Sequence, residues 1–131
     1  MTKIDDDKAE AAMKNDKFKF TIELDWYTIH GVLVSGIEGD MTRQWAYIDV
    51  GKHEPGWANY FTATFEDHAD GQNERGKGKK YKLSKSKILE GLTIIREKYP
   101  RHFADILNEN SDSITGDVLI QCSVLGDVVY G

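Results

Sequence analysis

Residues 83–100 of the 131-residue chain have the sequence LSKSKILEGLTIIREKYP, which predicts the best-defined helix of the fold. Ser84 can cap its first turn, and Leu83 can pack on Ile88 as a hydrophobic staple. Pro100 ends the pattern, because proline is not accommodated in a helix interior. Four side chains at helical spacing form the apolar stripe of this helix: Ile88, Leu92, Ile95 and Tyr99.

A second, shorter helix is predicted to begin at Pro100 itself. Proline is well tolerated in a first helical turn, since the amide hydrogen that it lacks would have no partner there. Residues 108–110, with the sequence NEN, are expected to end this helix. Its side chains that face the core are Phe103, Ile106 and Leu107.

A third helix is predicted over residues 114–125. Asp112 or Thr115 can cap its start, and Gly126 can terminate it. The segment is rich in β-branched residues, so a strand remains open as the alternative.

The N-terminal half begins with a predicted strand and a helix. Residues 17–24 alternate apolar and polar side chains with period two, which is typical of a half-buried strand. Asp25 is the expected N-cap of the helix, and Gly39 is its expected end. The core side chains of this helix recur at helical spacing: Trp26, Ile29, Leu33 and Ile37.

Further strands are predicted over 45–50 and 60–66, separated by the turn formers Pro55 and Gly56. A short strand over 81–83 would close a hairpin. Together these elements predict an α+β fold: a small, mostly antiparallel sheet of three to four strands, packed by about four helices. Three of these helices lie in the C-terminal half.

The chain length predicts one domain, over residues 17–131. Residues 1–16 are polar and charged, and we expect a mobile tail. Residues 5–8, Asp-Asp-Asp-Lys, resemble a protease-cleavage linker that lacks one aspartate, which leaves open whether the tail is native. No apolar run approaches the ~20 residues of a membrane span, and no signal peptide is recognisable. We therefore expect a cytoplasmic protein with no membrane partner.

Charge is distributed unevenly along the chain. Residues 75–87 contain no acid and carry +7, so that the rest carries −12 within a net charge of −5. Such a basic segment can meet phosphate groups or an acidic protein face, and it is also compatible with a simple solvated hairpin connection. Its bases are Arg75, Lys77, Lys79, Lys80, Lys82, Lys85 and Lys87.

Residues 71–77, GQNERGK, match the first seven positions of a phosphate-binding loop. Gly78 stands where serine or threonine would hold magnesium, and no helix N-terminus follows to receive a phosphate. The segment is therefore interpreted as a glycine-rich hairpin loop.

Asp67 and His68 are weak candidates for a metal site, because they belong to a run of carboxylates and imidazole at a strand end. Adjacent strand residues point to opposite faces, however, so a solvated strand end is favoured and no metal site is assigned. The single cysteine, Cys122, excludes an internal disulfide and is expected to be a buried thiol. We find no catalytic triad and expect no cofactor.

Aromatic residues gather around the basic segment. Stacking of bases on aromatic rings beside lysines is how single-stranded nucleic acids are bound, although aromatic side chains also fill the cores of small sheets. The candidate binding residues are Arg75, Lys77, Lys79, Lys80, Tyr81, Lys82, Trp45, Tyr47 and Trp57.

The C-terminal segment carries a recognisable pattern: EKYPRHFAD at 97–105, NEN at 108–110, TGDV at 115–118, QC at 121–122 and VYG at 129–131. It resembles a family of small, uncharacterised proteins encoded by bacteriophages, prophages and plasmids of Gram-negative bacteria. The resemblance covers about the last 45 residues and brings no catalytic residue with it. It implies an accessory protein of a mobile element, located in the bacterial host cell, of a kind that often binds host proteins.

Three functional hypotheses follow. The favoured one is non-catalytic binding to a host or defence protein. The alternatives are a nucleic-acid or nucleotide binder that uses the basic loop 75–87, and a small metal-dependent enzyme centred on Asp67 and His68. The identity of the partner and the oligomeric state stay open at this stage.

Overall fold

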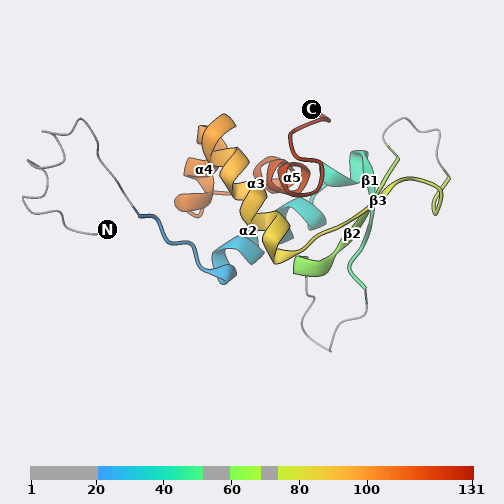
Figure 1. Cartoon of the computed structure of the whole chain (residues 1–131), viewed down its shortest axis with the longest axis horizontal. Coiled ribbons are helices and arrows are strands. Elements are labelled where there is room, and N and C mark those ends of the chain that lie inside the picture. The colour runs from blue at the N-terminus through green and yellow to red at the C-terminus, as the bar shows by residue number, and fades with distance from the viewer. Residues whose placement is uncertain (1–20, 52–59, 69–73) are drawn as a thin grey trace, which may run out of the picture.

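The computed structural model of the protein describes residues 21–51, 60–68 and 74–131. Helices form most of the described chain, and a three-stranded sheet lies at one side of them (Figure 1). The predicted α+β class is therefore confirmed. The elements in chain order are α2 (Trp26–Glu38), η1 (Thr42–Gln44), β1 (Ala46–Asp49), η2 (Tyr60–Thr62), β2 (Thr64–Asp67), β3 (Lys80–Lys82), α3 (Lys85–Lys98), α4 (Pro100–Leu107) and α5 (Ser113–Val124).

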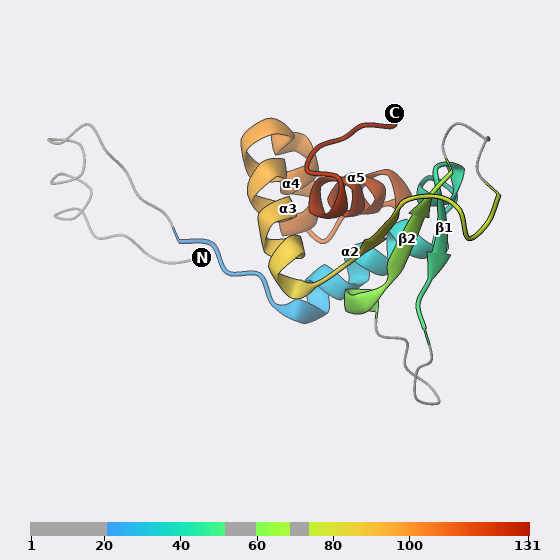
Figure 2. The same ribbon diagram turned by 45° about the vertical axis from the view of Figure 1, so that its right-hand side comes forward.

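Helix α5 is the centre of the fold. Ten of its twelve residues are buried, the pattern of a helix enclosed on all sides. Helices α2 and α3 both pack along it, and the sheet lies on the side away from α4 (Figure 2). Asp112 caps its start, because its carboxylate accepts a hydrogen bond from Thr115 N at 2.9 Å. The helix prediction for 114–125 is confirmed, and the strand alternative is wrong.

Small residues set the spacing between α5 and its neighbours. Gly36 of α2 faces Gly116 of α5 so closely that a Cβ added at Gly36 would lie 2.7 Å from the Gly116 carbonyl carbon. Gly91 of α3 faces Ser123 of α5 in the same way. The two helix pairs are therefore packed backbone against backbone.

The predicted helix caps of the C-terminal half are confirmed. Ser84 Oγ accepts from Lys87 N at 3.2 Å, and Leu83 and Ile88 are both fully buried, as the staple requires. Pro100 is the first residue of α4. Helix α2 is likewise capped by Asp25, which accepts from Thr28 N at 2.7 Å.

The sheet is an antiparallel meander in the order β1-β2-β3. Its register places Ile48, Phe65 and Tyr81 side by side on the face toward the helices, where Phe65 is fully buried. The alternate positions Tyr47, Glu66 and Lys80 form a row on the opposite face, which we call the outer face. No helix in the described part of the chain has the length and apolar character of a membrane span.

Two strand predictions need correction. Residues 21–24 of the predicted strand 17–24 have no regular structure, and they lead into α2 on the helical side of the molecule, away from the strands with which they would have to pair (Figure 2). Tyr60–Thr62 form a 3-10 turn instead of the start of a strand, because Tyr60 and Phe61 pack on His30 of α2. Residues 1–16 and 17–20 lie outside the described residues.

Candidate functional site

The predicted basic segment begins as an ordered connection on the outer face of the sheet. Glu66 is 6% exposed, and its Oε2 accepts hydrogen bonds from Gly76 N at 2.6 Å and Gly78 N at 3.3 Å. The ladder continues beyond the strands, since Asp67 N donates to Lys79 O at 2.9 Å. Residues 74–82, here called the basic hairpin, are thus held against β2 by the Glu66 carboxylate and by backbone hydrogen bonds.

Three planar groups lie together beside the basic hairpin. The rings of Tyr47 and His68 have centroids 4.2 Å apart, and the Arg75 guanidinium carbon lies 5.2 Å from the Tyr47 centroid. Arg75 is exposed, and Tyr47 and His68 are half-buried. We call these residues the outer-face cluster. The sequence indicated Tyr47 and Arg75 as binding residues, whereas His68 was considered only as a metal ligand.

The other predicted binding residues are divided between the surface and the core. Lys77, Lys79, Lys80 and Lys82 are exposed, whereas Tyr81 is half-buried on the helix-facing side, with Lys79 Nζ 5.2 Å from its ring centroid. The prediction of Trp45 as a binding residue is wrong. Trp45 is 2% exposed, and its indole ring packs between the sheet and the chain end. Trp57 lies outside the described residues.

Asp67 and His68 do not converge on a common point. The Asp67 carboxylate accepts from Tyr130 OH at 2.7 Å, whereas the His68 ring packs on Tyr47. In the described ranges, no group of three histidine, cysteine or acidic side chains is arranged to hold a metal ion. Both residues thus take part in packing and hydrogen bonding within the fold.

A buried polar network lies beneath the sheet, at Asp117 of α5. Asp117 is 4% exposed, and its carboxylate accepts from Thr42 Oγ1 at 2.7 Å, Trp45 Nε1 at 2.9 Å and Gln121 Nε2 at 2.7 Å. From the sequence, the Asp117–Gln121 spacing could not be distinguished from that of a solvated helix face. The many apolar neighbours of both residues in the chain were the available signal that this face is buried.

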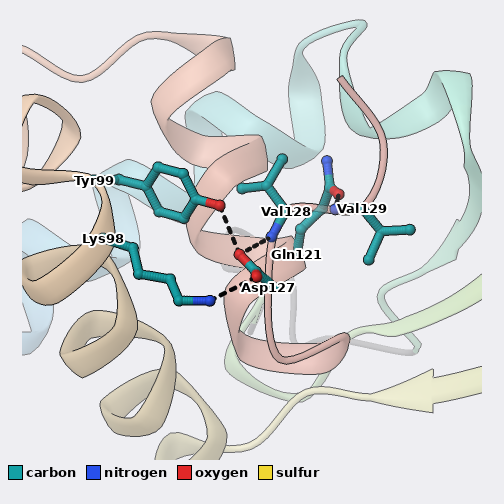
Figure 3. Close-up of polar contacts among 6 residues, drawn as sticks. All are labelled: Lys98, Tyr99, Gln121, Asp127, Val128 and Val129. Atoms are coloured by element: carbon teal, nitrogen blue, oxygen red, sulfur yellow. Dashed lines mark hydrogen bonds and ion pairs between the residues drawn. The ribbon is translucent and has the colours of Figure 1, made fainter.

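The chain end is tied to the fold by side chains of α3, of the α3–α4 junction and of α5 (Figure 3). Gln121 Oε1 accepts from Val129 N at 2.8 Å and from Tyr130 N at 2.9 Å. Asp127 accepts from Lys98 Nζ at 2.7 Å and from Tyr99 OH at 2.6 Å. The hydrogen bond from Lys98 is the main cause that lowers the pKa of Asp127 to about 2. These contacts make the C-terminal residues part of the scaffold.

Cys122 is a core residue, as the sequence predicts. It is 1% exposed, and burial raises the pKa of its thiol to about 11. A thiol with so little thiolate at neutral pH is a poor nucleophile and a poor metal ligand.

An apolar groove lies on the helical side of the molecule. Its cavity volume is about 790 Å³, and it runs between the residues that precede α2 and the helices α3 and α4. Ile22 is 52% exposed and Leu89 is 54% exposed within it. The sequence does not reveal this groove, because the alternation at 17–24 predicts a strand that includes Ile22. Its main apolar lining residues are Ile22, Leu24, Trp26, Leu89, Leu92 and Phe103.

Comparison of the chain with protein-family models, with curated proteins and with solved structures found no match in any of the three.

Proposed function

We propose that this protein acts by non-catalytic binding to another protein, and that the apolar groove is its binding surface. The partner is a host or defence protein, and the binder is an accessory protein of a phage or another mobile element. The C-terminal pattern at 97–105 and 115–118 supports this context through its resemblance to such proteins. The apolar groove is the observation that carries the proposal.

The groove combines exposed apolar side chains with an open shape. Ile22, Trp26 and Leu89 are each at least 37% exposed, and all three line the same cavity. Exposed apolar groups that are gathered in one place mark interaction surfaces, whereas single ones are ordinary. A cavity of about 790 Å³ can accept several side chains of a partner.

The polar residues of the groove indicate what kind of segment fits. Among the lining residues, Glu23 and Asp25 lie in the segment that precedes α2, and Arg96 lies on α3. Charges of both signs at an apolar groove favour a peptide segment with an apolar face and polar flanks, such as an amphipathic helix of the partner. They give no preference for a polyanion.

The experiment begins with cross-linking from the groove. A photoreactive amino acid at position 89 of the full-length chain, used in lysate of a Gram-negative host, identifies the captured protein by mass spectrometry. The captured protein is then purified, and its affinity for the unmodified chain is measured by calorimetry. We expect a stoichiometric complex that Leu89→Lys weakens at least tenfold, because the charge would be buried at the contact.

Ile114→Lys is the matched control, since Ile114 is 49% exposed on α5 and does not line the groove. It should leave the affinity within about twofold. Equal affinity of both variants, or the absence of any stoichiometric partner, would contradict the proposal. Self-association that Leu89→Lys abolishes would instead identify a second copy of the chain as the occupant, which sedimentation measurements detect.

A further inference from the structure

The geometry points to a second binding surface with a different ligand: we propose that the outer face of the sheet and the basic hairpin bind single-stranded nucleic acid. This inference goes beyond the proposed function, since it concerns another side of the molecule and another class of ligand. The sheet lies opposite α4, whereas the apolar groove is lined by α3 and α4 (Figure 2).

The charge of the basic hairpin suits a phosphate backbone. Its residues 74–82 carry five basic side chains and one acid, Glu74, which forms an exposed ion pair with Lys77 at 3.5 Å. On β3, Lys80 and Lys82 are two residues apart, so both side chains leave the strand on the outer face. Lysines spaced along an extended strand can follow successive phosphates of an extended chain.

The scaffold presents these charges in a fixed arrangement. In the outer-face row, the acid Glu66 lies between Tyr47 and Lys80. Glu66 is buried under the hairpin, where its carboxylate accepts hydrogen bonds from Gly76 N and Gly78 N. Its carboxylate is thereby hydrogen-bonded to backbone amides and shielded from solvent. The hairpin stays ordered on the sheet without placing a carboxylate at the surface of this row. The next outer row consists of Lys82, Thr64 and the exposed Asp49, whose Oδ1 accepts from Gly51 N at 2.7 Å.

The outer-face cluster provides the planar groups that a base requires. Arg75 is exposed, and its guanidinium carbon lies 5.2 Å from the Tyr47 ring centroid, while the His68 ring centroid lies 4.2 Å from that of Tyr47. A guanidinium that is oriented over a ring can present its own plane to a base, and imidazole can do the same. We assign the stacking contact to the Arg75 guanidinium, with Tyr47 as its positioning residue.

These features favour a single strand over a duplex. Bases within a duplex are stacked on one another and hide their faces, so a planar cluster can contact them only when they are unpaired. An acidic protein face would satisfy the lysines but would not use the planes of the cluster. The two classes of ligand therefore predict different responses to a substitution that keeps the charge of Arg75.

The experiment measures fluorescence anisotropy of labelled oligothymidine and oligouridine of about 20 nucleotides with the full-length chain. Binding should weaken steeply between about 50 and about 200 mM salt, since each phosphate contact adds about −0.7 to the logarithmic salt slope of a single strand. The double variant Lys80→Gln/Lys82→Gln should reduce that slope by about 1.4 if both lysines contact phosphate.

Arg75→Lys separates stacking from charge. It keeps the positive charge and removes the plane, so we expect about a tenfold loss of affinity with an unchanged salt slope. Arg96→Gln/Arg101→Gln is the matched control, because it removes two exposed charges that lie on α3 and α4. This control should leave both the affinity and the salt slope nearly unchanged.

Each other outcome would overturn the inference. Absence of binding at about 50 mM salt excludes a nucleic-acid surface. Equal losses in the hairpin and control doubles would show attraction by overall charge alone. Duplex DNA or polyglutamate that binds as tightly as the single strand, with no effect of Arg75→Lys, would identify a duplex or an acidic protein as the ligand. Leu89→Lys should not affect this assay, so failure here is distinguishable from failure of the protein-binding proposal.

Discussion

Two glycines of the same helix are expected to respond in opposite ways to alanine. Gly36 faces the backbone of α5, and a Cβ there would lie 2.7 Å from the Gly116 carbonyl carbon and 2.9 Å from its oxygen. Gly31, one and a half turns earlier in α2, is exposed and has nothing within 4 Å of an added Cβ. The pair isolates the effect of close helix packing from that of helix propensity.

The magnitudes follow from these distances. Replacing glycine by alanine within a helix stabilises it by about 0.8–1 kcal/mol when space is available, which we expect at Gly31. At Gly36 two of the three nearest atoms belong to the Gly116 backbone, and the third is Ile120 Cδ1 at 2.8 Å. Because backbone atoms cannot rotate away, α2 and α5 must separate by almost 1 Å to restore normal carbon contacts of about 3.5 Å. Overpacking of this kind costs about 1–3 kcal/mol. The propensity gain is common to both variants, so Gly36→Ala should end up about 1–3 kcal/mol less stable than Gly31→Ala.

Urea unfolding followed by circular dichroism measures this difference. For a chain of this length it corresponds to roughly 4–11 °C between the melting temperatures of the two variants. The slope of the free energy of unfolding against urea should be the same for both, since neither substitution changes the surface exposed on unfolding. Equal stability of the two variants would refute the close packing of α2 on α5.

Four further predictions concern the contacts of the chain end, the buried polar network at Asp117 and the thiol. Asp127→Asn should lower the melting temperature at pH 7. Folding lowers the pKa of Asp127 from 3.8 to about 2, so the stabilisation by its carboxylate is present above pH 3.8 and is lost as the pH falls through about 2. The difference in melting temperature between the variant and the unmodified protein should therefore close between about pH 4 and pH 2. Lys98→Met removes the main donor to Asp127. In the Lys98→Met background, Asp127→Asn should therefore change the melting temperature at pH 7 by less than it does in the unmodified protein. Trp45→Phe should cost about 1–3 kcal/mol in urea unfolding, because it deprives the buried Asp117 carboxylate of a hydrogen-bond donor. Cys122 should react with a disulfide reagent at pH 8 far more slowly in the native protein than in guanidinium chloride, and fast native labelling would contradict its burial.

The helical half was predictable because local signals and tertiary packing agree there. The Ser84 cap, the staple and the Pro100 start depend on neighbours in sequence, and all three are present in the structure. The strand prediction for 17–24 was wrong in its described part, because alternation alone does not supply a partner strand. The burial of Asp117 was not predictable, since its partners Thr42 and Trp45 are more than 70 residues away in sequence.

For the candidate site residues as well, local features were predictable from the sequence and contacts distant in sequence were not. The exposed bases of the hairpin follow from composition, and the structure places Lys80 and Lys82 on the outer face. Trp45 was misassigned, because a tryptophan next to a basic segment has the same local sequence whether it stacks on a ligand or on the core. The partnership of His68 with Tyr47 is a cross-strand contact, which only the register of β1 on β2 could reveal.

The C-terminal segment belongs to the scaffold of the fold. Gln121 binds the backbone of Val129 and Tyr130, and Tyr130 in turn stacks on Trp45 with ring centroids 5.6 Å apart and donates to Asp67 of β2. The chain end therefore connects α5 to the sheet, so substitutions there would alter the fold before they altered a ligand contact. The two proposed binding surfaces instead consist of exposed side chains that do not hold the chain end in place. Both proposals are therefore tested by substitutions at exposed positions of the full-length chain.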